Sequence, residues 1–281
     1  LSTDAVIEDL RQIREPNVFI VDDVAFVHAD HGMELADAVE RHGIRKQWYL
    51  ETRCDVLLRN EEVFRRWAKL GLKYMFLGIE ALDEEGLKAF RKRSTPNTNF
   101  KALEVARKLG IEVAINIIVD PMWDRERFRH LREWAMAVPE IVHCTVRTPY
   151  PGTEIWPSES QQLTTQDYRL FDMQHAVLPT KLPLDEFYRQ LVETQAVLNR
   201  KHLSWAALRG ASGILIERLL HGQTNFARML WKFSGVYNAE RQYGDHQRET
   251  TYRMSVPADV PDGDSEAHES RVSLPLFVHG A

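Results

Sequence analysis

Five short apolar segments alternate with helix-like segments in the first half of the chain, and each apolar segment ends on polar or charged residues. The five are NVFIVDD at 17–23, QWYLETR at 47–53, YMFLGIE at 74–80, EVAINIIVDP at 112–121 and VHCTVRTPYPGT at 142–153. Starts spaced about 25–40 residues apart fit a repeating unit of one strand and one helix. In such a parallel array the carboxyl ends of the strands form the ligand-binding face. The pattern therefore predicts a site at these strand ends.

The sequence also contains residues that predict where helices begin and end. A basic residue, a glycine and a branched apolar residue precede three of the strands, which predicts left-handed glycines that end helices at Gly43, Gly71 and Gly110. Apolar residues at helical spacing predict amphipathic helices around 63–70 and 128–135. We expect the helix N-caps to be Ser2 or Thr3, Asp83, Asn99 and Asp124.

These elements predict an α/β fold, a partial (β/α) barrel or an open parallel sheet with parallel strands. It occupies residues 1–157, and an all-helical region at 158–244 follows, with helices near 185–205, 212–221 and 223–233. The charged, proline-containing residues 245–281 are expected to be a disordered tail. Because the chain opens on an amphipathic helix with no strand before it, we interpret it as an N-terminally truncated fragment that lacks the first strand.

Composition narrows the function classes. A net charge of −5 over 281 residues argues against a general nucleic-acid binder. Two cysteines exclude a disulfide framework, and no apolar run is long enough to cross a membrane. We therefore expect a cytoplasmic protein.

The polar residues at the strand ends are the candidates for chemistry. They are Asp22, Asp23, Glu51, Arg53, Glu80, Asn116, Asp120 and Arg147. Any one of them could be a helix cap or half of an ion pair, because a buried charge needs a partner. Five successive strand ends with acids, an arginine and an asparagine suit a zwitterionic ligand that carries a ribose. The TPYPGT segment is either an extended stretch whose backbone reads a purine edge or a structural turn.

Residues 17–156 resemble the radical S-adenosylmethionine domain of cobalamin-dependent radical enzymes. The resemblance rests on five segments in the same order, IVDD, ETRCDVLL, GIEALDEEGLKAFRKRST, KLGIEVAINIIVD and TPYPGTEIW. A narrower resemblance over 17–244 points to the members that methylate C-3 of a hopanoid lipid, through INIIVDPMWDRERF, PEIVHCTVRTPYPGTEIW and GQTNFARMLWKFSGVYN. It implies a methyltransferase that, at full length, uses S-adenosylmethionine, a 4Fe-4S cluster, cobalamin and an electron donor. The alternatives are a relative with another substrate, a cluster-free scaffold protein on the same fold, or an ordinary (β/α) enzyme that binds a phosphorylated ligand.

The resemblance also implies roles for single residues. Asp22 and Asp23 would contact the amino group of S-adenosylmethionine, and Glu80 would hold its ribose hydroxyls. Arg53 and Lys92 would take the carboxylate, with Arg91 and Arg93 as competing choices for Lys92. The residues that would line the ribose and adenine are Asn116, Pro149, Tyr150, Gly152 and Thr153.

The chain departs from the family pattern at the cluster. The family binds its cluster through a Cys-x3-Cys-x2-Cys loop, which this chain lacks, and Cys54 and Cys144 are too far apart to replace it. The cobalamin domain expected upstream is also missing from the chain. We therefore expect the fragment to be inactive alone, and we assign it no metal ligands. His28 and His31 lie on the predicted active face and could contact a ligand.

The segment 200–237 has a different charge from the rest of the chain. It carries six Lys or Arg residues against one acid, Glu217, with aromatic residues between them. Such helices can lie on an anionic membrane, which would make the protein peripheral at the inner membrane. The alternative, slightly favoured, is that they cap the barrel and bury apolar residues at Leu215, Ile216, Leu219, Leu220 and Leu230. In either case we expect the region to help admit a lipid.

Overall fold

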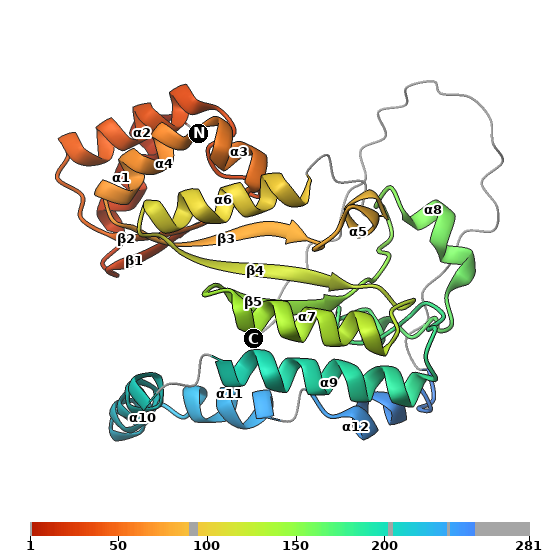
Figure 1. Cartoon of the computed structure of the whole chain (residues 1–281). Helices are drawn as coiled ribbons and strands as arrows, with labels where there is room; N and C mark the ends of the chain where they lie inside the picture. The colour runs from red at the N-terminus through yellow and green to blue at the C-terminus, as the bar shows by residue number, and fades with distance from the viewer. Residues whose placement is uncertain (1, 90–94, 202–204, 235–236, 251–281) are drawn as a thin grey trace, which may run out of the picture.

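The computed structural model describes residues 2–89, 95–201, 205–234 and 237–250 of the chain. Five parallel strands form one sheet in which neighbours in space are also neighbours in sequence (Figure 1). They are β1 (Asn17–Ile20), β2 (Gln47–Arg53), β3 (Leu72–Glu80), β4 (Glu112–Val119) and β5 (Ile141–Val146). All five predicted strands are confirmed, as is the α/β class with an unclosed parallel sheet.

Helices fill the connections and then form the C-terminal region. The helices that precede, join or follow the strands are α1 (Thr3–Gln12), α2 (Ala29–Arg41), α3 (Cys54–Arg59), α4 (Glu61–Lys69), α5 (Glu84–Ala89), α6 (Pro96–Lys108), α7 (Arg125–Ala137) and α8 (Trp156–Glu159). The C-terminal helices are α9 (Leu184–Lys201), α10 (Trp205–Leu220), α11 (Asn225–Ser234) and α12 (Ala239–Asp245). Two single-turn 3₁₀ helices, Ser160–Gln162 and Tyr168–Leu170, lie between the two groups.

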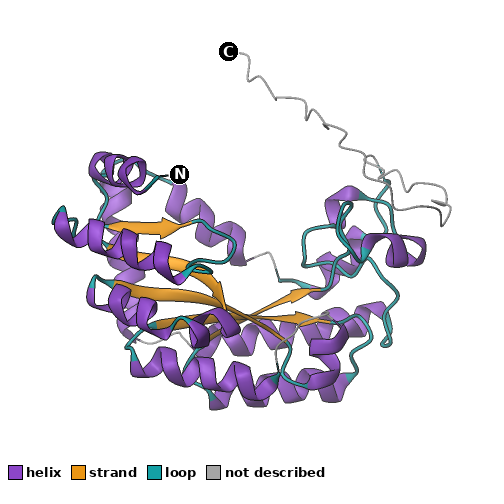
Figure 2. Ribbon diagram, turned by 90° about the horizontal axis from the view of Figure 1, so that it is seen from above, coloured by secondary structure: helices purple, strands orange, loops and turns teal. Residues whose placement is uncertain are grey.

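The two faces of the sheet differ in burial. Along β2 and β3 every second side chain is fully buried under the helices, while the alternate side chains stay partly exposed. On this second face, side chains of neighbouring strands contact each other. The ring centroids of Tyr49 and Tyr74 are 5.8 Å apart, and Asn116 Nδ2 of β4 donates to Thr145 Oγ1 of β5 at 2.8 Å. Figure 2 shows the helices along the outer side of the curved sheet. The other face is therefore left for a ligand or a further layer.

An aromatic cluster fixes the loop that follows β1. Phe26, at the end of that loop, stacks on Trp67 at 5.0 Å between ring centroids, and Trp67 packs edge-on against Trp48 at 5.2 Å. Asn60 Nδ2 donates to the Phe26 carbonyl oxygen at 2.8 Å, and Thr52 Oγ1 donates to the Ala25 carbonyl oxygen at 2.9 Å. The loop is held by both packing and hydrogen bonds.

The predicted helix boundaries are mostly confirmed. Gly43, Gly71 and Gly110 all have positive φ, and Ser2 and Asp124 accept hydrogen bonds as N-caps. The Asn99 prediction is wrong. Thr95 caps α6 and Pro96 begins it, so Asn99 lies inside the helix, where it is buried and donates to the Ile79 carbonyl oxygen.

The C-terminal helices correct a second prediction. α9 packs against α7 and β5, and α12 packs against α9. In contrast, none of the α10 and α11 side chains that the structure describes is buried. Ile216, Leu219 and Leu220 of α10 are exposed, and Leu230 of α11 is exposed as well. These helices therefore do not bury their apolar residues on the barrel, and Leu215 is only partly covered.

α12 and the residues after it are anchored to α9 by a partly buried hydrogen bond. Tyr188 Oη lies 2.6 Å from His246 Nε2 and accepts the Ala176 backbone N–H at 3.0 Å. In the tautomer that carries its proton on Nδ1, His246 Nε2 accepts from the Tyr188 hydroxyl, and protonation of Nε2 would end this arrangement. Asp245 and His246 therefore belong to the packed structure, although they fall within the predicted tail at 245–281, most of which lies outside the described residues.

Gly71 should tolerate a side chain far less well than Gly110. Both have positive φ, but a Cβ on Gly71 would lie 2.4 Å from the Lys46 carbonyl oxygen, whereas nothing lies within 4 Å of one on Gly110. Gly110→Ala should lower the free energy of unfolding by about 1 kcal/mol, and Gly71→Ala by about 3 kcal/mol or more because the steric overlap adds to the φ cost. Urea denaturation of the two variants measures the difference, and equal losses would contradict the clash.

His246 should make folding stability depend on pH. Burial, together with repulsion from His175, lowers its pKa from 6.5 to about 4. Since the pKa is lower in the folded state, the unfolded state takes up the proton first. The stabilisation is present above pH 6.5 and is lost as the pH falls towards 4. The free energy of unfolding should fall more steeply over this window in the parent chain than in His246→Gln. His42→Gln, at an exposed histidine, is the control and should keep the parent's slope.

Candidate functional site

The parallel register brings the predicted strand-end residues to one edge of the sheet. Arg53 of β2 pairs with Gly78 of β3, and Gly78 pairs with Asn116 of β4. Neighbouring strands lie about 4.8 Å apart, so Glu80 and Asn116 can reach one small ligand. Asp22 and Asp23 follow the outermost strand on one side, and Pro149–Thr153 follow the outermost strand on the other. These two groups are roughly 19 Å apart along the sheet.

Glu80 ends β3 in an unusual backbone conformation. Its φ is +67°, and the register with β4 shifts between Gly78 and Glu80. This conformation costs a non-glycine residue free energy, and such strained residues are enriched at functional sites. A Cβ on Gly78 would lie 3.2 Å from Glu80 Oε1, so the carboxylate folds back over the glycine. Gly78 therefore leaves room for the Glu80 carboxylate on the open face.

Asn116 carries a buried acceptor with no partner. Its Nδ2 donates to Thr145 Oγ1, but its buried Oδ1 accepts no hydrogen bond from any residue that the structure describes. An unsatisfied buried acceptor costs free energy and calls for an explanation. A ligand hydroxyl or amino group would satisfy it. Asn116 is the best evidence in the structure that this edge is built for a ligand.

The two predicted cationic contacts are less well placed. Arg53 is largely exposed, and its guanidinium holds both oxygens of the Asp55 carboxylate, at 2.9 and 2.7 Å. It would have to leave that pair to take a ligand carboxylate. Lys92, with its alternatives Arg91 and Arg93, lies outside the described residues.

Asp22 and Asp23 are both exposed in the loop after β1. The end of that loop is pinned, because Ala25 N–H donates to the Glu51 carbonyl oxygen at 2.8 Å and Phe26 is locked in the core. His28 and His31 are also exposed, at the start of α2. The aspartates are therefore available to a cation, on a loop that the aromatic cluster holds in place.

The segment after β5 is a turn, not the extended stretch given as one alternative. Thr153 N–H donates to the Tyr150 carbonyl oxygen at 3.1 Å, with Pro151 between them and Gly152 at φ +84°. Proline followed by a glycine with positive φ is the pattern of a type II turn. Tyr150 Oη donates to the Phe171 carbonyl oxygen at 2.9 Å, and partial burial raises the pKa of Tyr150. Pro149 is buried.

Asp120 and Arg147 are partners of each other, as the ion-pair alternative allowed. Arg147 Nη1 lies 3.0 Å from Asp120 Oδ2, and its Nη2 contacts Glu159 of α8. All three side chains are mostly buried. Sequence reasoning missed Glu159, because nothing in a turn-rich segment indicates which acid folds back onto β5. This network ties the ends of β4 and β5 to α8 and the 149–153 turn.

No metal-binding group is found in the part of the chain that the structure describes, since no three His, Cys, Asp or Glu side chains are suitably placed. Cys54 Sγ lies 3.7 Å from the Gly78 carbonyl oxygen, and burial raises the pKa of Cys144 to about 12. Both are buried free thiols. The described residues fit S-adenosylmethionine through Asn116 and Glu80, but they do not fit an iron–sulfur cluster.

Comparison with known proteins identifies the domain. Residues 1–135 match the family model of the radical SAM superfamily. The chain is 63% identical to hopanoid C-3 methylase of Methylococcus capsulatus over 279 residues, which cover 99% of this chain and 53% of that protein. It is 22% identical to anaerobic magnesium-protoporphyrin IX monomethyl ester cyclase of Rubrivivax gelatinosus over 172 residues, which cover 59% of this chain and 30% of the cyclase. The chain thus spans about half or less of the length of these relatives.

A structural comparison matches the cobalamin-dependent S-adenosylmethionine radical enzyme OxsB. The TM-score is 0.42 with 18% identity, over 47% of this chain and 22% of that one. The family match and the parallel sheet with its helices agree with the expected fold. Residues 1–135 of the chain form a radical SAM domain.

Proposed function

We propose that this chain is the S-adenosylmethionine-binding part of a cobalamin-dependent radical methyltransferase that acts on C-3 of a hopanoid lipid. The high identity to hopanoid C-3 methylase supports the substrate. The observation that carries the binding role is the unpartnered Asn116 Oδ1 beside the strained Glu80 at the carboxyl ends of β3 and β4.

Each predicted residue then has a role in binding. The Glu80 carboxylate accepts hydrogen bonds from the two ribose hydroxyls, and Asn116 Oδ1 accepts one from the ribose or the adenine amino group. Asp22 and Asp23 attract the ammonium group. Arg53 and Lys92 take the ligand carboxylate, with Arg91 and Arg93 as alternatives to Lys92. The turn formed by Pro149, Tyr150, Gly152 and Thr153 covers the adenine.

A 4Fe-4S cluster and cobalamin, when bound, supply the electron and the methyl group. The described residues hold neither group, so we assign this chain the binding and orientation of S-adenosylmethionine on the open face of the sheet. We expect it to be inactive alone and to need an electron donor at full length. The helix-covered face keeps water away from the buried strands, and the Arg147 network fixes the edge where the ligand lies.

Replacing Glu80 should weaken S-adenosylmethionine binding without unfolding the chain. Removing a charge-assisted hydrogen bond costs about 1.5–3 kcal/mol, so Glu80→Gln should raise Kd roughly ten- to hundredfold. Gly78→Ala should also weaken binding, because its Cβ crowds the carboxylate. Isothermal titration with S-adenosylmethionine measures both. Glu112→Gln, at the opposite end of the sheet on β4, is the matched control. If Glu80→Gln binds as tightly as the parent, Glu80 is not in the site, and failure of the parent to bind would favour the scaffold alternative.

We further propose that α10 and α11 contact an anionic membrane. The described chain contains no helix that is long and apolar enough to span a bilayer. The two helices nevertheless expose Leu220 at 81% and Trp231 at 76%, next to basic residues such as Arg228 and Lys232. Basic residues near an anionic surface contribute about 1 kcal/mol each. The exposed pair of helices therefore suits a protein that collects a lipid from the membrane surface.

Charge reversal on α11 should release the chain from anionic vesicles. Arg228→Glu with Lys232→Glu should lower the partition coefficient on phosphatidylglycerol-containing vesicles at least tenfold, through lost attraction and added repulsion of about 1 kcal/mol per charge. Vesicle cosedimentation measures the effect. Lys101→Glu with Lys108→Glu on α6 makes the same change in net charge and should have little effect. If the two double variants lowered the partition coefficient equally, the net charge of the chain would explain the binding and α11 would have no special role. If neither lowered it, the membrane proposal would be wrong.

A further inference from the structure

A polar cavity lies beyond β5, next to the segment that Tyr150 contacts through Phe171. Its volume is about 730 Å³, and it is bounded by residues 167–175, α11 and α12. The first of these segments is attached to the sheet, because Val146 N–H donates to the Met173 carbonyl oxygen at 2.7 Å. No residue assigned above to S-adenosylmethionine lines this cavity.

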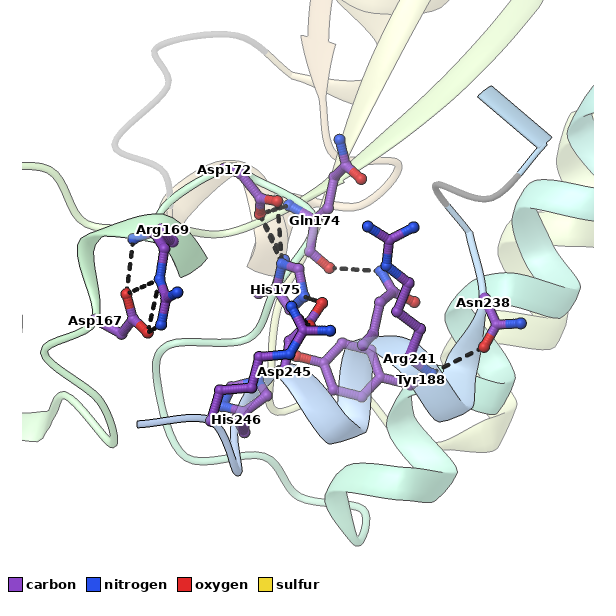
Figure 3. Close-up of polar contacts among 12 residues, drawn as sticks. Asp167, Arg169, Asp172, Gln174, His175, Tyr188, Asn238, Arg241, Asp245 and His246 are labelled. Carbon is purple, nitrogen blue, oxygen red and sulfur yellow. Dashed lines mark hydrogen bonds and ion pairs between the residues drawn. The ribbon is translucent and has the colours of Figure 1, made fainter. Parts of the chain in front are cut away.

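The charges that line the cavity are largely compensated within it. Arg169 holds the buried Asp167 carboxylate at 2.6 Å, and Arg248 lies 2.7 Å from Asp245. His175 Nδ1 lies 3.0 Å from Asp172, and its Nε2 lies 3.5 Å from Asp245. Figure 3 shows Asp172, His175 and Asp245 together at the centre, with Asp167 and Arg169 as a separate pair to one side. Such a lining offers many donors and acceptors and little net charge.

Three buried polar atoms of this lining have no hydrogen-bond partner among the described residues: His175 Nε2, Asp245 Oδ1 and Gln242 Oε1. The first two have an ion-pair neighbour, so Gln242 Oε1 is the acceptor left without either. Gln242 of α12 is only 1% exposed, and its Nε2 donates to the Gln174 carbonyl oxygen at 3.1 Å. Since a carbonyl oxygen can only accept, that contact fixes the orientation of the amide. Gln242 Oε1 is therefore the remaining acceptor, buried and without a hydrogen bond at the cavity. It requires a donor from whatever fills the space.

Trp231 of α11 adds an apolar wall. Its side chain lines the cavity yet is 76% exposed, so its ring is accessible at the mouth. An aromatic ring beside paired carboxylates, arginines and an amide is a set that can bind hydroxyl groups by hydrogen bonds and C–H faces by stacking.

We propose that this cavity binds a polyhydroxylated ligand, a sugar or polyol group with its hydroxyls on Gln242, Asp172 and Asp245 and its apolar face on Trp231. An anion fits less well although four bases, Arg169, Lys232, Arg241 and Arg248, line the cavity beside three acids, because an unprotonated anion has no donor for Gln242 Oε1. The described residues offer no metal-binding group. A purely apolar ligand would leave Gln242 Oε1 without a donor. The inference stands on the cavity and does not depend on S-adenosylmethionine binding.

The polyol could be free or could be the headgroup of a lipid. α11 supplies both the cavity wall and the exposed face proposed to meet the membrane, which places the cavity mouth beside a lipid surface. Three soluble probes separate the sources without any membrane: glucose, octyl β-D-glucoside below its micelle concentration, and octanol.

Titration calorimetry on the 281-residue chain tests the proposal. We expect saturable binding of octyl glucoside, with octanol unable to displace it. Trp231→Ala should weaken binding about fivefold through lost stacking, and Gln242→Met about fivefold through a lost hydrogen bond. Met229→Ala, at an exposed α11 residue outside the cavity lining, should bind like the parent. Thermal unfolding of each variant checks that α12 stays folded, and Trp231→Ala, at an exposed site, carries the test if Gln242→Met does not fold.

The probes give distinct outcomes. Octyl glucoside binding much tighter than glucose supports a lipid headgroup, and equal binding supports a free sugar or polyol. Failure of both sugars to bind overturns the proposal. Competition by octanol, or binding that Trp231→Ala leaves unchanged, also overturns it. None of these results bears on the Glu80 test, so the two proposals can fail separately.

Discussion

The shared direction of the five strands is the constraint on which the rest of the structure depends. Because every strand runs the same way, all carboxyl ends meet at one edge, and residues far apart in sequence such as Arg53, Glu80 and Asn116 become neighbours. The direction is enforced by the helices, which bury one face of the sheet with Trp48, Phe64, Trp67 and Phe128 almost completely covered. A slip of one residue in β3 would turn the Glu80 carboxylate into that core, where its desolvation would be prohibitive.

The same register creates the features of the site. Where β3 meets β4, the ladder shifts between Gly78 and Glu80, and the backbone of Glu80 enters a region that L-residues avoid. Such a conformation persists only where the surroundings over-determine it. Here the buried Ile79 on one side and the Ala81 N–H bonded to the Ile79 carbonyl oxygen on the other hold the turn. The result is a carboxylate that folds back over Gly78, the residue that pairs with Asn116.

Local signals in the sequence predicted the fold well, and long-range contacts account for what they missed. Apolar runs located the strands, and left-handed glycines located the helix ends, because both depend on neighbouring residues. The wrong cap at Asn99 arose from overlooking Thr95 before Pro96, although proline favours the first helical turn. For residues 149–153 the sequence allows a turn or an extended stretch. Pro151 followed by Gly152 favours the turn that the structure has. The Arg147–Glu159 pair and the Gln242 acceptor depend on how distant segments pack, and no local pattern contains that information.

The exposure of α10 and α11 links the two proposals about lipid. Helices of this length are marginal in water, and in folded proteins they are normally stabilised by burying an apolar face. These two bury no described side chain, although Ile216, Leu220 and Trp231 supply apolar area. The proposed contact with an anionic membrane would supply an apolar cover for them and a negative charge for their basic residues. Trp231 belongs both to that exposed face and to the wall of the polyol cavity. A lipid that enters past α11 would place its polar group in the cavity and its apolar part towards the membrane, so one tryptophan would serve both contacts.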